Sequence, residues 1–217
     1  MRQRARSSED KERRAEELLN AAEELALELG GVRHVTLAAV TERAGLHRTG
    51  VRRYYAGKEQ LLLELAERGW GRWRDAVTAD VADRTALDPT QTAAVISRTL
   101  ISLPLFCDLL THVTLHLEGD VDIETARRYK TNAFAAHNEI AATLARVSSL
   151  TAEQIVDLLA VSVVLAAGFW QASHPTPTLA ALYEEVPSWG HAVLDFGPRL
   201  DHLLRTFANG LTETTST

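Results

Sequence analysis

Apolar residues recur at steps of three or four through most of the chain, the spacing that places them on one face of a helix. The first such series ends with Leu29, directly before the glycine pair Gly30-Gly31. Ser7 followed by Asp10 has the spacing of an amino-terminal capping box. The pattern therefore predicts a helix from about residue 10 to residue 29, preceded by a flexible arm at residues 1–9.

Shorter helices are predicted next. Thr36 stands where an amino cap belongs, and Gly45 ends the segment that follows it near residue 44. After a break of about three residues, the pattern predicts a third helix at residues 47–54. A fourth helix begins near Lys58. The sequence thus predicts three or four helices around one small apolar core.

Beyond residue 84 the apolar periodicity favours longer helices. They are predicted at residues 89–103, 105–117, 122–147, 151–173 and 197–211. Pro104 separates the first two of these, and Thr151 with Gln154 gives a second capping-box match. A shorter helix is expected at residues 179–186, and residues 212–217 are expected to be a disordered tail. Because no segment shows the alternation of a strand, the sequence predicts an all-α protein of about nine or ten helices.

Charge is distributed unevenly along the chain. The net charge is −6, but residues 1–74 carry 15 Lys and Arg against 12 Asp and Glu, whereas residues 75–217 carry 8 against 17. Six cations and one anion fall between Arg33 and Lys58. This local basic patch, rather than the average, is what a nucleic acid would meet.

The remaining composition favours the cytoplasm as the protein's location. The single cysteine, Cys107, has no partner for an internal disulfide, and residues 1–14 are charged rather than apolar. The most apolar run, Leu158 to Trp170, is thirteen residues without a charge. Since a bilayer needs about 20 residues, we expect a buried helix there and no membrane partner.

Two short helices joined by a turn containing glycine, the second rich in arginine, are typical of a helix-turn-helix that enters the DNA major groove. Lys58 and the free N–H groups at the start of the fourth helix favour binding of a phosphate. Gly50 costs about 1 kcal/mol within a helix, which close approach to a DNA backbone would justify. The candidate DNA-binding residues are Thr36, His47, Arg48, Thr49, Gly50, Arg52, Arg53, Tyr54 and Lys58.

The alternative interpretation is structural. Arg52 and Arg53 taken alone are typical of a solvated face, and either tyrosine of the pair Tyr54-Tyr55 suits a core. Within the helix-turn-helix pattern we expect the arginines to face DNA, Tyr55 to be buried and the Tyr54 hydroxyl to point outward.

Residues 10–74 resemble the amino-terminal domain of TetR/AcrR-type transcriptional regulators. The resemblance is carried by Thr36, by Ala44-Gly45-Leu46, by Tyr54-Tyr55 and by the run Lys58-Glu59-Gln60-Leu61-Leu62. It implies a non-enzymatic homodimer on a palindromic operator, with a helical ligand-binding and dimerisation domain at residues 75–211.

The resemblance also implies roles for single positions. Lys58 and Tyr54 match phosphate-contacting positions, while Arg48, Thr49 and Arg52 match positions that face bases or nearby phosphates. The chain departs from the family pattern at His47, at Thr49-Gly50 and at Arg52. Two roles are open for Arg52. It could bind a guanine, a contact worth ~1–3 kcal/mol of discrimination between bases, or it could bind a phosphate.

The carboxy-terminal domain carries aromatic and polar residues suited to a small-molecule pocket, although each of them is also an ordinary core residue. The candidate pocket residues are Trp70, Trp73, Phe106, His112, His116, Phe134, Asn138 and Trp170. Asp108, His112 and His116 share one helix stripe, which leaves a metal-dependent or small-molecule-binding helical protein as an alternative function. No metal, cofactor or catalytic motif is predicted.

The dimer is predicted to form through residues 151–173 and 197–211. The first segment is apolar around most of its circumference, so we expect it to be buried on both sides. Packing of both helices against their symmetry mates is one explanation, and the family resemblance favours it. A monomer that buries the first helix internally is the other. The leading hypothesis from the sequence is a dimeric, ligand-responsive repressor.

Overall fold

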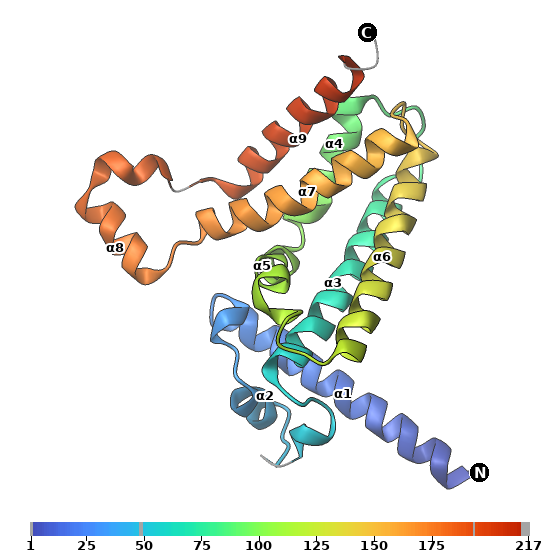
Figure 1. Ribbon diagram of the computed structural model, residues 1–217, viewed down its shortest axis with the longest axis vertical. Coiled ribbons are helices and arrows are strands. Elements are labelled where there is room, and N and C mark those ends of the chain that lie inside the picture. Colours follow the sequence, from blue (N-terminus) through green and yellow to red (C-terminus); the bar gives the residue numbers. More distant parts are fainter. Residues whose placement is uncertain (1, 48–49, 193, 214–217) are drawn as a thin grey trace. The chain divides into compact units, whose positions relative to one another are not determined.

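The computed structural model describes residues 2–47, 50–192 and 194–213, and within them the protein is all-α as predicted (Figure 1). No strand occurs in these ranges, apart from one isolated parallel bridge between Leu87 and Ser148. The helices are α1 Arg2–Glu28, α2 Leu37–Arg43, α3 Lys58–Asp80, α4 Pro89–Ile101, α5 Pro104–His112, α6 Ile123–Ala145, α7 Ala152–Ser173, α8 Pro177–Glu185 and α9 Phe196–Glu213.

The first and last helices are longer than predicted. Helix α1 begins at Arg2, so the helix start expected near residue 10 and its cap at Ser7 are wrong. The first 28 residues contain no Gly or Pro, and Arg13 forms ion pairs one turn away with Asp10 (3.3 Å) and Glu17 (2.8 Å). Such pairs extend a helix without a cap. Helix α9 likewise continues to Glu213, and residues 214–217 of the predicted tail lie outside the described ranges.

The predicted caps are confirmed where they begin α2 and α7. The Thr36 hydroxyl accepts a hydrogen bond from the Ala39 amide at 3.2 Å. Thr151 and Gln154 form the reciprocal capping box, with bonds of 3.2 and 2.9 Å. Asp88 forms another box at the start of α4 that the sequence reading missed, although Asp-Pro-Thr-Gln carries the same spacing.

By its internal contacts the chain divides into two compact units. The first contains Met1–Arg68 and His112–Thr131, and the second contains Gly69–Thr111 and Asn132–Thr217. This division differs from the predicted domain boundary at residue 74, because a later segment joins the first unit. The predicted helix at 105–117 is also divided: α5 ends at His112, and a wider π turn, η3 (Val113–Leu117), follows.

The first unit is held by an apolar core and by a cation on α3. Arg68, whose side chain is 16% exposed, forms ion pairs with Glu16 (2.9 Å) and Glu23 (3.1 Å) of α1. Its guanidinium also donates to the Asn20 amide oxygen at 2.8 Å. Removing Arg68 would leave the carboxylates of Glu16 and Glu23 without their counter-charge. These ion pairs therefore hold α3 against α1.

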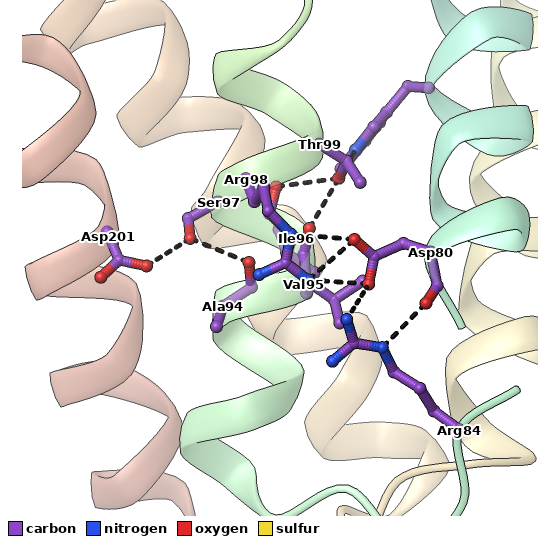
Figure 2. A network of polar contacts seen from close by, with 10 residues as sticks. Asp80, Arg84, Ala94, Val95, Ile96, Ser97, Arg98, Thr99 and Asp201 are labelled. Atoms are coloured by element: carbon purple, nitrogen blue, oxygen red, sulfur yellow. Dashed lines mark hydrogen bonds and ion pairs between the residues drawn. The ribbon is translucent and has the colours of Figure 1, made fainter.

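In the second unit, α4 is joined by polar contacts to α3 on one side and to α9 on the other (Figure 2). Arg98 of α4 binds the Asp80 carboxylate of α3 at 2.7 Å. Ser97 of α4 donates to Asp201 of α9 at 2.5 Å, and Arg205 binds the same carboxylate at 2.6 Å.

The Asp201 carboxylate is expected to make stability depend on pH. Burial alone would raise its pKa, but hydrogen bonds from Arg205 and Ser97 outweigh burial and hold the pKa below the ordinary 3.8. A lowered carboxyl pKa stabilises the fold fully above the unfolded-state pKa, and that contribution is lost as pH falls through the folded-state value.

Asp201→Asn should therefore lower the free energy of unfolding by about 0.5–1 kcal/mol at pH 7, since the carboxylate is one-third exposed. The difference from wild type should vanish near pH 2. Urea unfolding at both pH values measures it, with the exposed Asp83→Asn as control. An equal loss at both pH values would contradict this account.

Helix α7 buries one face and exposes the other. Ile155, Leu158 and Ala166 are buried, whereas Val156 is 46% exposed and Val164 is 70% exposed. Burial on both sides is therefore not provided by the described chain alone. By length and composition α7 is one helix that meets the requirements for crossing a membrane, with 28% of its most apolar window buried.

Candidate nucleic-acid interface

Helix α2 is fixed to α1 by an ion pair that the sequence reading missed. Arg43 binds Glu28 through two bonds of 2.6 and 2.9 Å and approaches Glu24 at 3.4 Å. Glu28 raises the pKa of the Arg43 guanidinium above its ordinary value, chiefly through hydrogen bonding. Because its charge is paired internally, Arg43 does not contribute to the basic patch counted from the sequence.

The turn after α2 has the geometry expected of a helix-turn-helix. Gly45 adopts a left-handed conformation (φ 65°), which L-residues rarely adopt. The Leu46 amide then donates to the Thr41 carbonyl at 2.9 Å, which closes the turn.

The segment after this turn differs from the predicted helix at 47–54. Its described part contains one 3-10 turn, η2 (Val51–Arg53), and the candidates Arg48 and Thr49 lie outside the described residues. The segment is short, and Gly50 inside it lowers helix propensity. The Gly50 amide instead closes a turn onto the His47 carbonyl at 2.7 Å.

Gly50 makes a tight local contact. Its φ of −73° suits any residue, but a Cβ there would lie 3.1 Å from the His47 carbonyl oxygen. A larger residue there would require the His47 carbonyl to shift by a few tenths of an ångström. Close approach to a DNA backbone stays a prediction.

Buried side chains on either side of η2 present its arginines to solvent. Val51 is 4% exposed and Tyr55 is 1% exposed, whereas Arg52 and Arg53 are exposed. The Tyr55 hydroxyl donates to the Ala15 carbonyl of α1 at 3.5 Å, and burial, together with the charge of Glu64, raises its pKa. The expected burial of Tyr55 is confirmed.

The candidate DNA-binding residues also include three that carry hydroxyl or imidazole groups: Thr36, His47 and Tyr54. Tyr54 is half-buried, while Thr36 and His47 are exposed. They lie in the same unit as Arg52 and Arg53, and the outward orientation of the Tyr54 hydroxyl stays a prediction. These are donor types that bind phosphate oxygens in protein–DNA complexes.

Lys58 begins α3, where the first backbone N–H groups have no partner within the helix. Its ammonium donates to the Arg33 carbonyl at 3.0 Å, and burial lowers its pKa from the ordinary value. A cation beside a helix amino terminus attracts an anion. The structure thus provides a candidate phosphate site next to the exposed arginine turn in the sequence.

Three of the predicted pocket residues lie together in the second unit. The ring centroids of Trp70 and Phe106 are 5.3 Å apart, and that of Trp73 lies 5.5 Å from Trp70. His137, 6.2 Å from Trp70, joins this aromatic cluster. A Cβ on Gly69 would lie 2.3 Å from the Phe106 ring, so the cluster depends on glycine at that position.

The other predicted pocket residues lie elsewhere. Phe134 is 61% exposed and Asn138 is exposed. Trp170 stacks on His174 with centroids 3.9 Å apart. His112 and His116 lie in the first unit, with their ring centroids 5.4 Å apart.

A metal centre has no support in the described residues, because nowhere in them do three His, Cys, Asp or Glu side chains form a group able to hold an ion. The proposed stripe of Asp108, His112 and His116 therefore does not form such a group. Cys107 is buried, and burial raises the pKa of its thiol to about 12.

The capped helix α2, the tight turn at Gly45 and the exposed arginine turn that follows are features expected of a helix-turn-helix DNA-binding protein. Comparison with known families agrees. Residues 18–65 match the family described as "Bacterial regulatory proteins, tetR family", and residues 67–215 match "Tetracyclin repressor-like, C-terminal domain". The chain therefore belongs to the TetR family of DNA-binding transcriptional regulators, a non-enzymatic family.

Solved structures show the same fold at low sequence identity. A TetR transcriptional regulator from Rhodococcus sp. RHA1 aligns over 95% of this chain and 98% of its own, with TM-score 0.58 and 17% identity. A TetR-family regulator from Streptomyces coelicolor aligns over 91% and 99%, with TM-score 0.51 and 18% identity. No curated protein sequence matches the chain significantly.

Proposed function

We propose that this regulator is a ligand-responsive repressor that acts in the cytoplasm and binds a palindromic operator as a homodimer. The observation that carries the proposal is the exposed turn Arg52-Arg53, fixed between the buried Val51 and Tyr55 and followed by Lys58 at the start of α3. Arginine suits base edges and phosphates, and the helix amino terminus suits phosphate.

The exposed face of α7 supports a homodimer. Helices α7 and α9 run antiparallel, since Gln154 at the start of α7 donates to the Leu211 carbonyl near the end of α9 at 2.8 Å (Figure 1). Their predicted pairing with the same helices of a second copy, through residues 151–173 and 197–211, would bury Val156 and Val164. Half-sites would then lie about one helical turn of DNA apart, or a multiple of it.

The proposed small-molecule effector rests on the family to which the chain belongs. In the structure Trp70, Trp73 and Phe106 are buried against one another, so a ligand would have to bind beside this aromatic core or open it. Apolar walls with a few polar groups suit such a ligand. In the proposed mechanism, a ligand bound among the carboxy-terminal helices shifts α3 and changes the separation of the two DNA-reading segments.

Electrophoretic mobility shift on DNA flanking the protein's own gene, and on a palindrome selected from random DNA, tests this function. Arg52→Ala and Lys58→Ala should each weaken binding about 10-fold and lower the salt dependence if the contact is to phosphate. If Arg52 reads a guanine, its removal should instead relax specificity at one base pair.

Arg146→Ala, at an exposed position in the second unit, serves as the charge-matched control and should bind like wild type. Failure of any palindrome to bind at moderate salt would overturn the operator proposal, as would wild-type binding by both site variants. A thermal-shift screen of small molecules tests the effector, because a ligand that binds the folded state raises its apparent stability.

A further inference from the structure

The described chain between α7 and α9 forms an arm, defined here as residues 174–192 and 194–195, that contains α8 and the short helix η4 (Pro187–Ala192). Figure 1 shows this arm extending away from the two helices that it connects. None of the residues of α8 is buried, and α8 packs against η4 of the same arm. The arm thus exposes Leu179 (41%) and Trp189 (49%) to solvent.

A nine-residue helix is too short to be stable alone in water, where helices below about 12–15 residues are marginal. The cap at its start, where Thr176 accepts from the Leu179 amide, contributes about 1 kcal/mol. Most helix stability comes from packing of an apolar face. Covering Leu179 and Trp189 with an apolar surface would therefore stabilise the arm further.

The base of the arm is attached to both neighbouring helices. Trp170 of α7 stacks on His174 and also meets Phe196 of α9 edge to face, with centroids 5.1 Å apart. The His174 ring is fixed by contacts of its Nδ1 atom with the Trp170 carbonyl (2.9 Å) and the Ser173 hydroxyl (3.0 Å). These contacts fix where the arm leaves the α7 and α9 pair.

Charge narrows the choice of the covering surface. The arm contains Glu184, Glu185 and Asp195 but no Lys or Arg. Such a segment is repelled by DNA and by anionic lipid. An apolar protein surface suits Leu179 and Trp189 better. In a second copy of this chain, α7 exposes Val156 and Val164, on a face that also carries Glu153 and Asp157.

We propose that the arm packs on the second protomer and completes the dimer. This inference rests on the proposed homodimer, since the arm starts and ends on the two helices assigned to its interface. The arm would add a large aromatic side chain, Trp189, beside the exposed Val156 and Val164, and tryptophan is among the residue types enriched at binding hot spots.

The first experiment measures the dimer dissociation constant of the full chain by analytical ultracentrifugation. Leu179→Ser with Trp189→Ser should raise it at least 10-fold while the monomer keeps its helix content, because both side chains are exposed in the single chain. Leu115→Ser, at a 71% exposed position of the first unit, is the matched control and should leave it unchanged.

The second experiment locates the arm directly. A photo-crosslinking phenylalanine analogue replaces Trp189, and isotopically light and heavy copies are mixed before irradiation. Crosslinks should join light to heavy chains. Crosslinks confined to chains of one isotope, or to other elements of the same chain, would overturn the proposal and would instead identify the arm as a cover for its own unit.

Failure of the arm is distinguishable from failure of the dimer. A wild-type monomer in the ultracentrifuge would overturn both. A wild-type dimer that Val164→Glu dissociates, but that the double arm variant leaves unchanged, would overturn the arm proposal and keep the α7 interface.

Discussion

Val164→Glu is expected to convert the protein to a monomer and to weaken operator binding by about 10²–10⁴-fold. Val164 is 70% exposed in the single chain, so a carboxylate there is hydrated in the monomer and costs little. In the proposed dimer the same carboxylate would be desolvated in an apolar interface without a partner. The large loss of operator affinity follows because a dimer binds DNA through two linked segments, whereas a monomer binds through one.

Sedimentation at micromolar concentration measures the oligomeric state, and mobility shift measures the operator affinity. Leu115→Glu, which adds the same charge at an equally exposed position of the first unit, is the control for charge alone. Retention of a dimer by Val164→Glu, with normal DNA binding, would show that α7 does not form the interface.

Trp73→Ala is expected to lower the free energy of unfolding by about 3–5 kcal/mol, the range for a large aromatic core residue. Trp73 is 0% exposed, lies among Trp70 and Phe106, and donates through its indole N–H to the Thr99 hydroxyl at 3.1 Å. Urea unfolding followed by circular dichroism measures the loss. If Trp73 instead faced an open, water-filled pocket, the substitution would lower the free energy of unfolding much less.

The hydrogen bond is separated from packing by a double-mutant cycle. Trp73→Phe keeps most of the ring and removes the indole N–H, while Thr99→Val removes its acceptor. The coupling between them should be about 1 kcal/mol. A loss below about 1 kcal/mol for Trp73→Ala would contradict a core role and favour its assignment to the pocket wall.

Two of the local capping signals in the sequence predicted helix starts correctly, whereas the one at Ser7 did not. Thr36 and Thr151 mark helix starts because a cap depends on residues only three positions apart. The start of α3 at Lys58 followed from the apolar periodicity after it, and the burial of Tyr55 from its place in the helix-turn-helix pattern.

Features that depend on distant residues could not be predicted in this way. Arg43 belongs to the basic patch by position along the chain, but its partners Glu24 and Glu28 lie 19 and 15 residues away. The tight approach of the His47 carbonyl to Gly50 is a backbone contact, which composition does not reveal. For α7, apolar periodicity shows how much surface must be covered but does not show which chain covers it.

The bond between the Lys58 ammonium and the Arg33 carbonyl changes what this lysine contributes on DNA. Its side chain is already ordered, so little rotamer entropy remains to be lost when a phosphate arrives. The ammonium has three N–H donors, so a phosphate can accept from another of them while the bond to the Arg33 carbonyl remains. Lys58 is therefore a preorganised residue, whose contribution to affinity comes chiefly from charge and falls as salt rises.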